Sequence, residues 1–253
     1  MESITPKKCL IVASGVHNHS EFVELVKERL GELLPVPEHL YERKPAEYIG
    51  GEYRNWTETP DTNIMLAFES VPWKDRDVPA CHVMGALLGE SNSFGDRIPG
   101  LGFNRAHQVI LNKNYVDLCQ GLNHHFSDSG IFGINIEGQG SHSEELMNTA
   151  IETLSDLKNP IGDEELSRAK NSLKMGIMRS LETQESRLEE MARNYQAEGE
   201  LNLHKQCDMI DSVSAEDVNR IAEKIFSGKP TMVVTGGAIN LVPNITDVQR
   251  QLN

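Results

Sequence analysis

Histidine is the residue type in this chain best suited to hold a catalytic metal, so its spacing is the first test of chemistry. His17 and His19 flank Asn18 in the segment HNHSE. Zinc peptidases place two ligands one helical turn apart, in HExxH or HxxEH, and this segment has neither spacing. His124 and His125 are adjacent in an expected strand, so their side chains point to opposite faces of a sheet. We therefore expect no metal or other cofactor on this chain.

Signatures of nucleophilic catalysis and of nucleotide binding are also missing from the sequence. No GxSxG elbow occurs, and no glycine-rich phosphate loop follows a strand. The cysteines form no CxxC pair, which indicates reduced, mostly buried thiols rather than a disulfide framework or a zinc knuckle. These cysteines are Cys9, Cys81, Cys119 and Cys207.

The segment most suggestive of function runs from Gly89 to Gly102 and reads GESNSFGDRIPGLG. It holds four glycines and one proline between two apolar stretches, with an aromatic residue, Phe94, where loops usually avoid one. Long loops inside a compact domain are usually functional or disordered. Composition alone leaves a binding loop and a plain surface connection equally open.

Charge limits the class of partner. The chain has 253 residues and a net charge of −14 at pH 7, whereas a nucleic-acid-binding protein carries a basic balance. An acidic protein attracts cationic partners such as arginine-rich peptides, although acidity also serves solubility. No run of eighteen apolar residues occurs, and the start, MESITPKK, lacks the apolar core of a signal peptide and the pattern of a transit peptide. Any organellar targeting signal must therefore lie on sequence outside this chain.

The order of hydrophobic patterns predicts an α+β fold, with an antiparallel or mixed sheet and helices on one face. Expected strands cover residues 8–13, 52–56, 63–70, 116–125, 130–137 and 231–235. Expected helices cover residues 20–34, 77–88, 104–111, 143–157 and 163–182, one that begins at 186, and 215–226. Ser20, Ser143 and Ser214 are the expected starts of three of these helices. The first strand and helix are isolated by a proline-containing linker, and such a pair is not a stable domain by itself.

Four stretches together resemble the second half of the M16 metallopeptidase family, in its α-type subunits. The resemblance runs from Ile4 to Gly237. The glycine-rich segment and the chain after it carry the α-type features, a Ser-Phe pair followed by Pro-Gly-Leu-Gly-Phe. The four stretches are LIVASGVHNHSEFVELVKERLGEL, YIGGEYR, GESNSFGDRIPGLGFNR, and the helices LSRAKNSLKMGIMRSLETQESRLEEMARN with SVSAEDVNRIAEKIFSGKPTMVVTG.

The resemblance implies an M16-type fold divided into three segments. Residues 1–37 would be the last strand and helix of an otherwise missing N-terminal M16-like domain. Residues 38–51 would be the linker, and residues 52–253 a C-terminal M16-like domain. A separate chain would then supply the rest of the N-terminal domain.

The resemblance also implies a function. Relatives of the α-type are non-catalytic, substrate-recognising subunits of mitochondrial presequence-processing peptidases, in the matrix or on the matrix face of the inner membrane. The family's HxxEH site lies in the missing part, and zinc is expected on a β-type M16 partner. Presequence peptides would be the substrate. The residues implied to bind them are Gly89, Ser93, Phe94, Pro99, Gly100 and Gly102.

One departure from the family pattern supports an alternative. Glu90, Asn92, Asp96, Arg97 and Ile98 stand where the family's loop has small residues. Residues other than glycine restrict φ and stiffen a loop. The alternative function is a structural core subunit of respiratory complex III, ubiquinol–cytochrome c reductase, with other subunits of that complex as partners.

Overall fold

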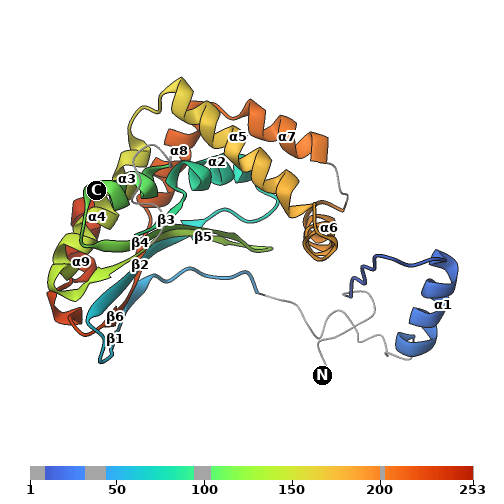
Figure 1. Cartoon of the computed structure of the whole chain (residues 1–253), viewed down its shortest axis with the longest axis horizontal. Helices are drawn as coiled ribbons and strands as arrows, with labels where there is room; N and C mark the ends of the chain where they lie inside the picture. The colour runs from blue at the N-terminus through green and yellow to red at the C-terminus, as the bar shows by residue number, and fades with distance from the viewer. Residues whose placement is uncertain (1–8, 32–43, 94–103, 200–202, 253) are drawn as a thin grey trace. The chain divides into compact units, whose positions relative to one another are not determined.

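The computed structural model describes residues 9–31, 44–93, 104–199 and 203–252. The chain divides into two compact units. The first comprises Met1–Ala46 with Gly176–Asn202, and the second comprises Glu47–Met175 with Leu203–Asn253. The second unit holds the sheet and is therefore the one that positions the candidate site (Figure 1).

A six-stranded mixed sheet forms the centre of the second unit, with the strand order β1-β6-β2-β5-β4-β3. β1 runs parallel to β6, and every other neighbouring pair is antiparallel. The predicted α+β class with a mixed sheet is therefore confirmed. The strands are β1 (Gly51–Trp56), β2 (Asp61–Ser70), β3 (Glu90–Asn92), β4 (Val116–His125), β5 (Gly130–Gln139) and β6 (Pro230–Gly236).

Helices of the second unit cover one face of this sheet. α2 packs on β4, α4 on β5 and β2, and α8 on β2 (Figure 1). The helices that lie wholly in this unit are α2 (Val78–Leu88), α3 (Arg105–Asn112), α4 (Ser143–Ser155), α7 (Leu203–Ser212), α8 (Ala215–Phe226) and α9 (Ile245–Leu252). The helix α5 (Asp163–Ser180) begins in the second unit and ends in the first.

The core lies between the sheet and these helices, and it follows from the alternation of the strands. Ile64, Leu66 and Phe68 of β2 are fully buried, whereas Met65, between the first two, is only partly buried. Successive side chains of a strand point to opposite faces of the sheet. Phe68 meets Phe226 of α8 edge-on, with ring centroids 5.3 Å apart, and Phe132 of β5 lies 6.0 Å from the same ring. The three rings join the two central strands to α8.

Local signals placed most of the predicted elements. The expected cap of α8 is confirmed, since Ser214 and Asp217 form a reciprocal capping box. α4 begins at Ser143, as predicted, with Glu144 and Glu145 in its first turn. β4 has the predicted bounds, and β2 extends the predicted 63–70 by two residues.

The start of the chain differs from the prediction. The strand expected over 8–13 does not form, since residues 9–13 have no regular secondary structure. A strand needs a neighbour for its backbone N–H and C=O groups, and all six described strands belong to the second unit. α1 (His19–Leu30) is capped by Asn18 rather than Ser20, because the Asn18 side-chain oxygen accepts from the backbone N–H of Ser20 at 3.0 Å.

One strand and two α-helices were not predicted. β3 takes up residues of the glycine-rich segment, and α7 and α9 lie in stretches with no predicted element. α9 has a local signal that was missed, because Asn244 accepts from the N–H of Asp247 at 3.0 Å in the manner of an N-cap. The remaining helix of the first unit is α6 (Gln184–Glu198), which Thr183 caps. Among the described residues, no helix combines the length and apolarity needed to cross a membrane.

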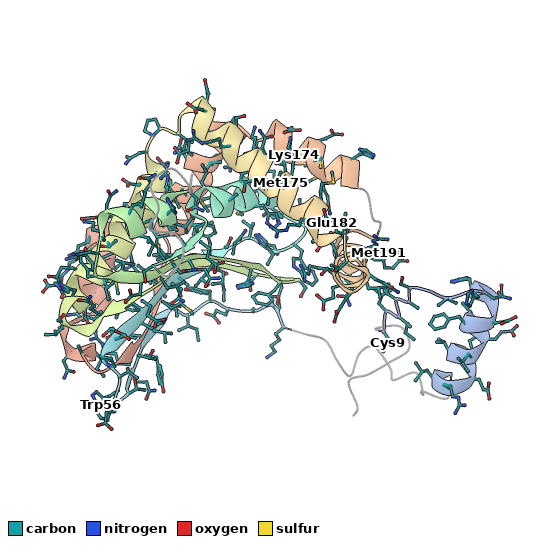
Figure 2. All side chains as sticks on the ribbon, in the orientation of Figure 1. Cys9, Trp56, Lys174, Met175, Glu182 and Met191 are labelled. Carbon is teal, nitrogen blue, oxygen red and sulfur yellow. The ribbon has the colours of Figure 1, made fainter. Side chains whose placement is uncertain are left out.

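The prediction of mostly buried thiols holds for two of the cysteines. Cys81 and Cys119 are fully buried, and burial raises their pKa to about 11 and about 12. Cys207 is half-buried, and Cys9 is exposed (Figure 2). The four thiols are free.

Candidate functional site

The glycine-rich segment begins between α2 and the edge strand β3, at Gly89, in a conformation that only glycine adopts readily. Gly89 ends α2 with φ 69° and ψ −160°, a region that is nearly exclusive to glycine. Its carbonyl accepts from the N–H of Gly121 at 2.8 Å. A Cβ at this position would overlap the side chain of Asn104. Gly89 therefore lets the two ends of the segment approach each other.

Replacing Gly89 by alanine should accordingly cost stability. We expect Gly89→Ala to lower the free energy of unfolding by about 2 kcal/mol, because of backbone strain and the overlap with Asn104. Chemical denaturation of both proteins measures the difference. Gly162→Ala is the matched control, because nothing lies within 4 Å of a Cβ there and its φ is not positive. Equal stability of the two variants would contradict the role given to Gly89.

The outgoing end of the segment is fixed to β4. Residues Glu90–Asn92 form the short edge strand β3, and Ser93 follows it. The Ser93 backbone N–H donates to the Asp117 carbonyl at 2.7 Å, and its hydroxyl donates to Asp117 Oδ1 at 2.9 Å. Ser93 thus anchors the segment rather than projecting freely from it.

The returning end is fixed by the first turn of α3. Asn104 caps this helix by accepting from the N–H of His107 at 2.8 Å, and its amide lies 3.5 Å from the Glu90 carbonyl. His107 is 2% exposed, and its Nδ1 lies 3.4 Å from Ser91 Oγ. We call residues 89–93 and 104–107 together the loop stem. Side-chain contacts hold both ends of the stem against the sheet.

Of the residues predicted to bind substrate, only those in the stem are described. Gly89 and Ser93 lie in the loop stem, where both have structural contacts. Phe94, Pro99, Gly100 and Gly102 fall outside the described residues. A role in substrate binding stays a prediction for all six. Two of the departures from the family pattern, Glu90 and Asn92, are strand residues of β3.

The loop stem lies at the β3 edge of the sheet, and its α3 residues lie on the helix-covered side, because α3 contacts both α2 and α4. We call the sheet face opposite α2, α4 and α8 the open face. On β2 and β5 its residues are the ones that alternate with the buried core positions. Asn63 donates to Glu137 across these strands at 3.1 Å, and Gln120 donates to Glu90 at 3.3 Å. No described helix of the second unit covers this face (Figure 1).

The charged residues of the described strands are mostly acidic. Arg54 is the one lysine or arginine within the six described strands. Its guanidinium is committed to Glu52 and to the carbonyls of Ile239, Val242 and Pro243. The carboxylates of the strands are Glu52, Asp61, Glu69, Glu90, Asp117 and Glu137. Asp61, Glu69 and Glu137 lie on the open face, which therefore favours a positively charged ligand. Glu52 lies on the helix-covered face, in register with the buried Met232.

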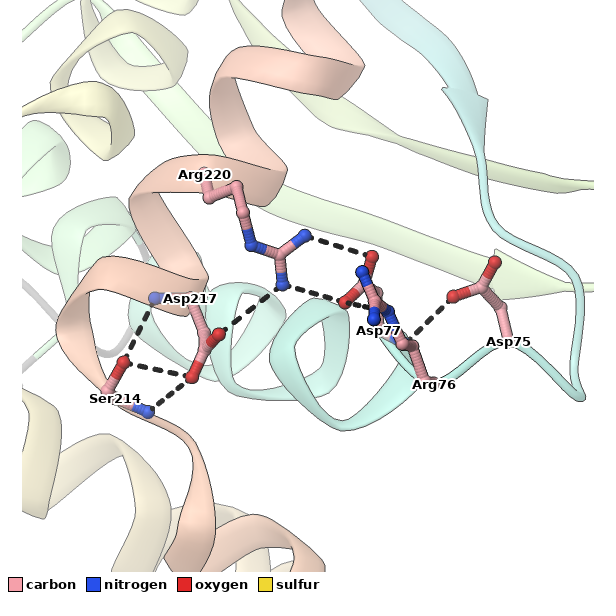
Figure 3. Close-up of polar contacts among 6 residues, drawn as sticks. All are labelled: Asp75, Arg76, Asp77, Ser214, Asp217 and Arg220. Carbon is pink, nitrogen blue, oxygen red and sulfur yellow. Dashed lines mark hydrogen bonds and ion pairs between the residues drawn. The ribbon is translucent and has the colours of Figure 1, made fainter.

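An ion-pair network ties α2, the helix that ends at Gly89, to α8 (Figure 3). Arg220 of α8 forms a two-pronged contact with Asp77, the residue before α2, at 2.7 and 3.1 Å. The Arg220 guanidinium also reaches Asp217 at 3.3 Å. Hydrogen bonds from Arg220 hold the pKa of Asp77 below its usual range. Sequence reasoning missed this network, because Asp77 and Arg220 are far apart along the chain.

The histidines do not assemble a metal site in the part of the chain that the structure describes. His124 and His125 lie on β4, as predicted. His125 meets His82 of α2 edge-on, with ring centroids 5.0 Å apart, and sequence spacing gave no sign of that pair. Among described residues, no group of three or more His, Cys, Asp or Glu side chains is placed to hold a metal ion.

Comparison with known proteins agrees with this architecture. Mitochondrial-processing peptidase subunit alpha of Solanum tuberosum is 29% identical over 248 residues, which cover 95% of this chain and 48% of that protein. A probable subunit alpha-2 of Arabidopsis thaliana is 28% identical over 263 residues, covering 99% of this chain and 50% of that protein. A probable subunit beta from Arabidopsis thaliana is 25% identical over 252 residues, covering 98% and 47%. The chain thus spans about half the length of these relatives.

A solved structure shares the fold. A chain of complex III2 from Candida albicans, with Inz-5 bound, superposes with a TM-score of 0.81 at 18% identity. The match covers 93% of this chain and 56% of that one. The sequence profile described as the peptidase M16 inactive domain matches residues 2–173. The profile covers more than half of the chain, and the chain therefore belongs to the peptidase M16 family, through its inactive domain.

Proposed function

We propose that this chain is a non-catalytic, substrate-recognising α-type subunit of a mitochondrial presequence-processing peptidase. The observation that carries the proposal is the loop stem, which anchors both ends of a glycine-rich segment at the edge of a sheet whose open face carries carboxylates. Presequences are arginine-rich and amphipathic, so a negatively charged surface attracts them. Membership of the M16 inactive-domain family and the similarity to named α subunits support the same function.

The proposal assigns the chemistry to other chains. A β-type M16 partner would hold zinc and activate water for peptide hydrolysis, and this chain would hold no cofactor. Residues 1–37 would complete an N-terminal M16-like domain with a further chain, joined through residues 38–51 to the C-terminal domain over 52–253. The assembly would act in the mitochondrial matrix or on the matrix face of the inner membrane.

Kinetics of the assembled enzyme test this function. Replacing residues 95–100 by a short glycine-serine linker spares β3 and Ser93, and it should raise the KM for a presequence peptide about tenfold with little change in kcat, because the loop binds substrate and does no chemistry. Phe94→Ala should raise KM in the same direction by a smaller factor. Phe126→Ala is the matched control, since that exposed phenylalanine follows the opposite end of β4. Kinetics indistinguishable from the parent enzyme would refute the proposal.

A second function, a structural core subunit of respiratory complex III, is favoured by the fold shared with a complex III chain. Under this alternative the chain would co-purify with cytochrome subunits in mild detergent. Native mass spectrometry of the same preparation would also reveal any β-type partner. Recovery solely as a heterodimer with a β-type chain would count against the alternative.

A further inference from the structure

The outer edge of β1 has an unpaired backbone. β1 is the last strand on one side of the sheet and pairs with β6 alone among the described strands. The Thr57 N–H donates to the Gly236 carbonyl, while Trp56 is the residue in register with Gly236. In a parallel pair the residues alternate, so Glu52, Arg54 and Trp56 direct their N–H and C=O groups away from β6. These groups form a template for an added strand.

This edge lacks the usual protection. Natural edge strands are shielded by charged side chains, lysine above all, by proline, by a bulge or by a covering element. The two charged residues of β1, Glu52 and Arg54, pair with each other. β1, with the sequence GEYRNW, contains neither lysine nor proline, and its register with β6 is continuous. The 3-10 helix Ile239–Leu241 contacts β1 as well as β6 and α4, so it lies over the helix-covered face rather than beyond the outer edge. On that face Arg54 donates to the carbonyls of Val242 and Pro243, and the Ile245 N–H donates to Glu52 at 3.0 Å. Five of the six β1 residues remain exposed.

Two aromatic side chains flank the edge. Tyr53 is 61% exposed. Trp56, which Figure 2 labels, is 62% exposed. The two residues are three positions apart in the strand, so Tyr53 lies on the open face and Trp56 on the opposite face. Ile49, just before the strand, is 77% exposed. A strand added here would meet an aromatic ring on each of its faces, and such rings also attract cations.

The charges around the edge select the occupant. Glu47 and Glu58 are exposed beside the two ends of β1, and Asp61 begins the next strand. Lys229 is the cation near the start of β1, where it lies beside Gly50. Arg54 is already neutralised by Glu52. A second copy of this chain would bring the same carboxylates face to face, whereas a basic segment would be attracted to them.

We propose that the outer edge of β1 binds a lysine- or arginine-rich peptide segment in extended conformation, as a seventh strand of the sheet. Main-chain hydrogen bonds from the edge would supply affinity, and Tyr53, Trp56 and the carboxylates would supply the preference for a basic, partly apolar sequence. The inference rests on the proposed function, in that the peptide it names is a presequence, and it assigns that peptide a place on the sheet.

Binding of a labelled arginine-rich presequence peptide to the full chain, followed by fluorescence anisotropy, tests the inference. Trp56→Ala should weaken binding about threefold by removing the ring. Trp56→Pro should weaken it about tenfold or more, because it also removes an outward N–H while the bonds to β6 stay intact. Tyr53→Ala should weaken binding about as much as Trp56→Ala. Tyr195→Ala is its control, since Tyr195 is also exposed but belongs to the first unit. Equal affinities of Trp56→Ala and Trp56→Pro would overturn the inference.

A change in the peptide provides a test that does not depend on folding of a variant. Methylating alternate backbone nitrogens of the peptide removes the donors of a paired strand, and it should abolish binding to the unaltered chain. Retention of binding by the methylated peptide would overturn the inference. So would concentration-dependent self-association that Trp56→Pro removes, because the occupant would then be a second copy.

The two proposals fail differently. If the β1 variants keep full affinity while Phe94→Ala loses it, the edge is not the site and the proposed function stands. If the β1 variants lose affinity while the loop replacement leaves KM unchanged, the edge binds basic peptides and the proposed function fails.

Discussion

Phe226→Ala is expected to lower the free energy of unfolding by about 4 kcal/mol, the largest loss from any substitution considered. Phe226 is 1% exposed and lies between Phe68 and Phe132. Alanine would remove the transfer free energy of the ring and leave a cavity between the central strands and α8. Urea denaturation followed by circular dichroism measures the change, as a shift of midpoint at constant slope.

Phe126→Ala is the matched control for this prediction. Phe126 is 48% exposed, and we expect its truncation to change stability by no more than about 0.5 kcal/mol. Phe226→Leu, which keeps most of the buried volume, should cost only about 1 kcal/mol. A loss below about 1 kcal/mol for Phe226→Ala would show that the three rings do not hold α8 to the sheet.

Arg220→Ala should cost about 3 kcal/mol at neutral pH, because it leaves the buried Asp77 carboxylate with only the more distant Arg76, 3.9 Å away. The side chain of Asp77 is 9% exposed, whereas that of Arg220 is 46% exposed. Asp77→Asn should therefore cost less, since Arg220 remains in contact with water and with Asp217. Arg250→Ala is the control. Arg250 pairs with Asp247 in the i,i+3 spacing that Arg220 has with Asp217, but at an exposed position, and exposed pairs contribute little to stability.

Acid should reduce the difference between Arg220→Ala and the parent protein. In the parent, the pKa of Asp77 is lowered by its hydrogen bonds with Arg220, so the pair stabilises the fold above the ordinary pKa of aspartate. That contribution is lost as the pH falls through the lower folded pKa. In the variant, protonation of Asp77 removes a buried charge that has lost its two-pronged contact with Arg220. A stability difference that stays constant between pH 7 and pH 3 would contradict this account.

The loop stem was only partly accessible to sequence reasoning. Gly89 stands directly after an apolar helical run, which is where a glycine that ends a helix is expected. The contact of Ser93 with Asp117 could not be predicted from the sequence, because Asp117 comes from a strand that follows a further helix. Asn104 and His107 had no distinguishing signal, since the contact between Asn104 and Gly89 exists only when the two ends of the segment meet.

The sequence by itself determined the local elements and the class of fold. Alternating apolar residues placed β2 and β5, and the pairing of Ser214 with Asp217 placed the start of α8, because these signals act between residues a few positions apart. Only the tertiary structure decided that β6 inserts between β1 and β2, and that Arg220 reaches Asp77. Such contacts join residues more than a hundred positions apart, and they depend on which surfaces pack together once the chain has collapsed. The open edge of β1 is a consequence of that strand order, and no local pattern in GEYRNW specifies it.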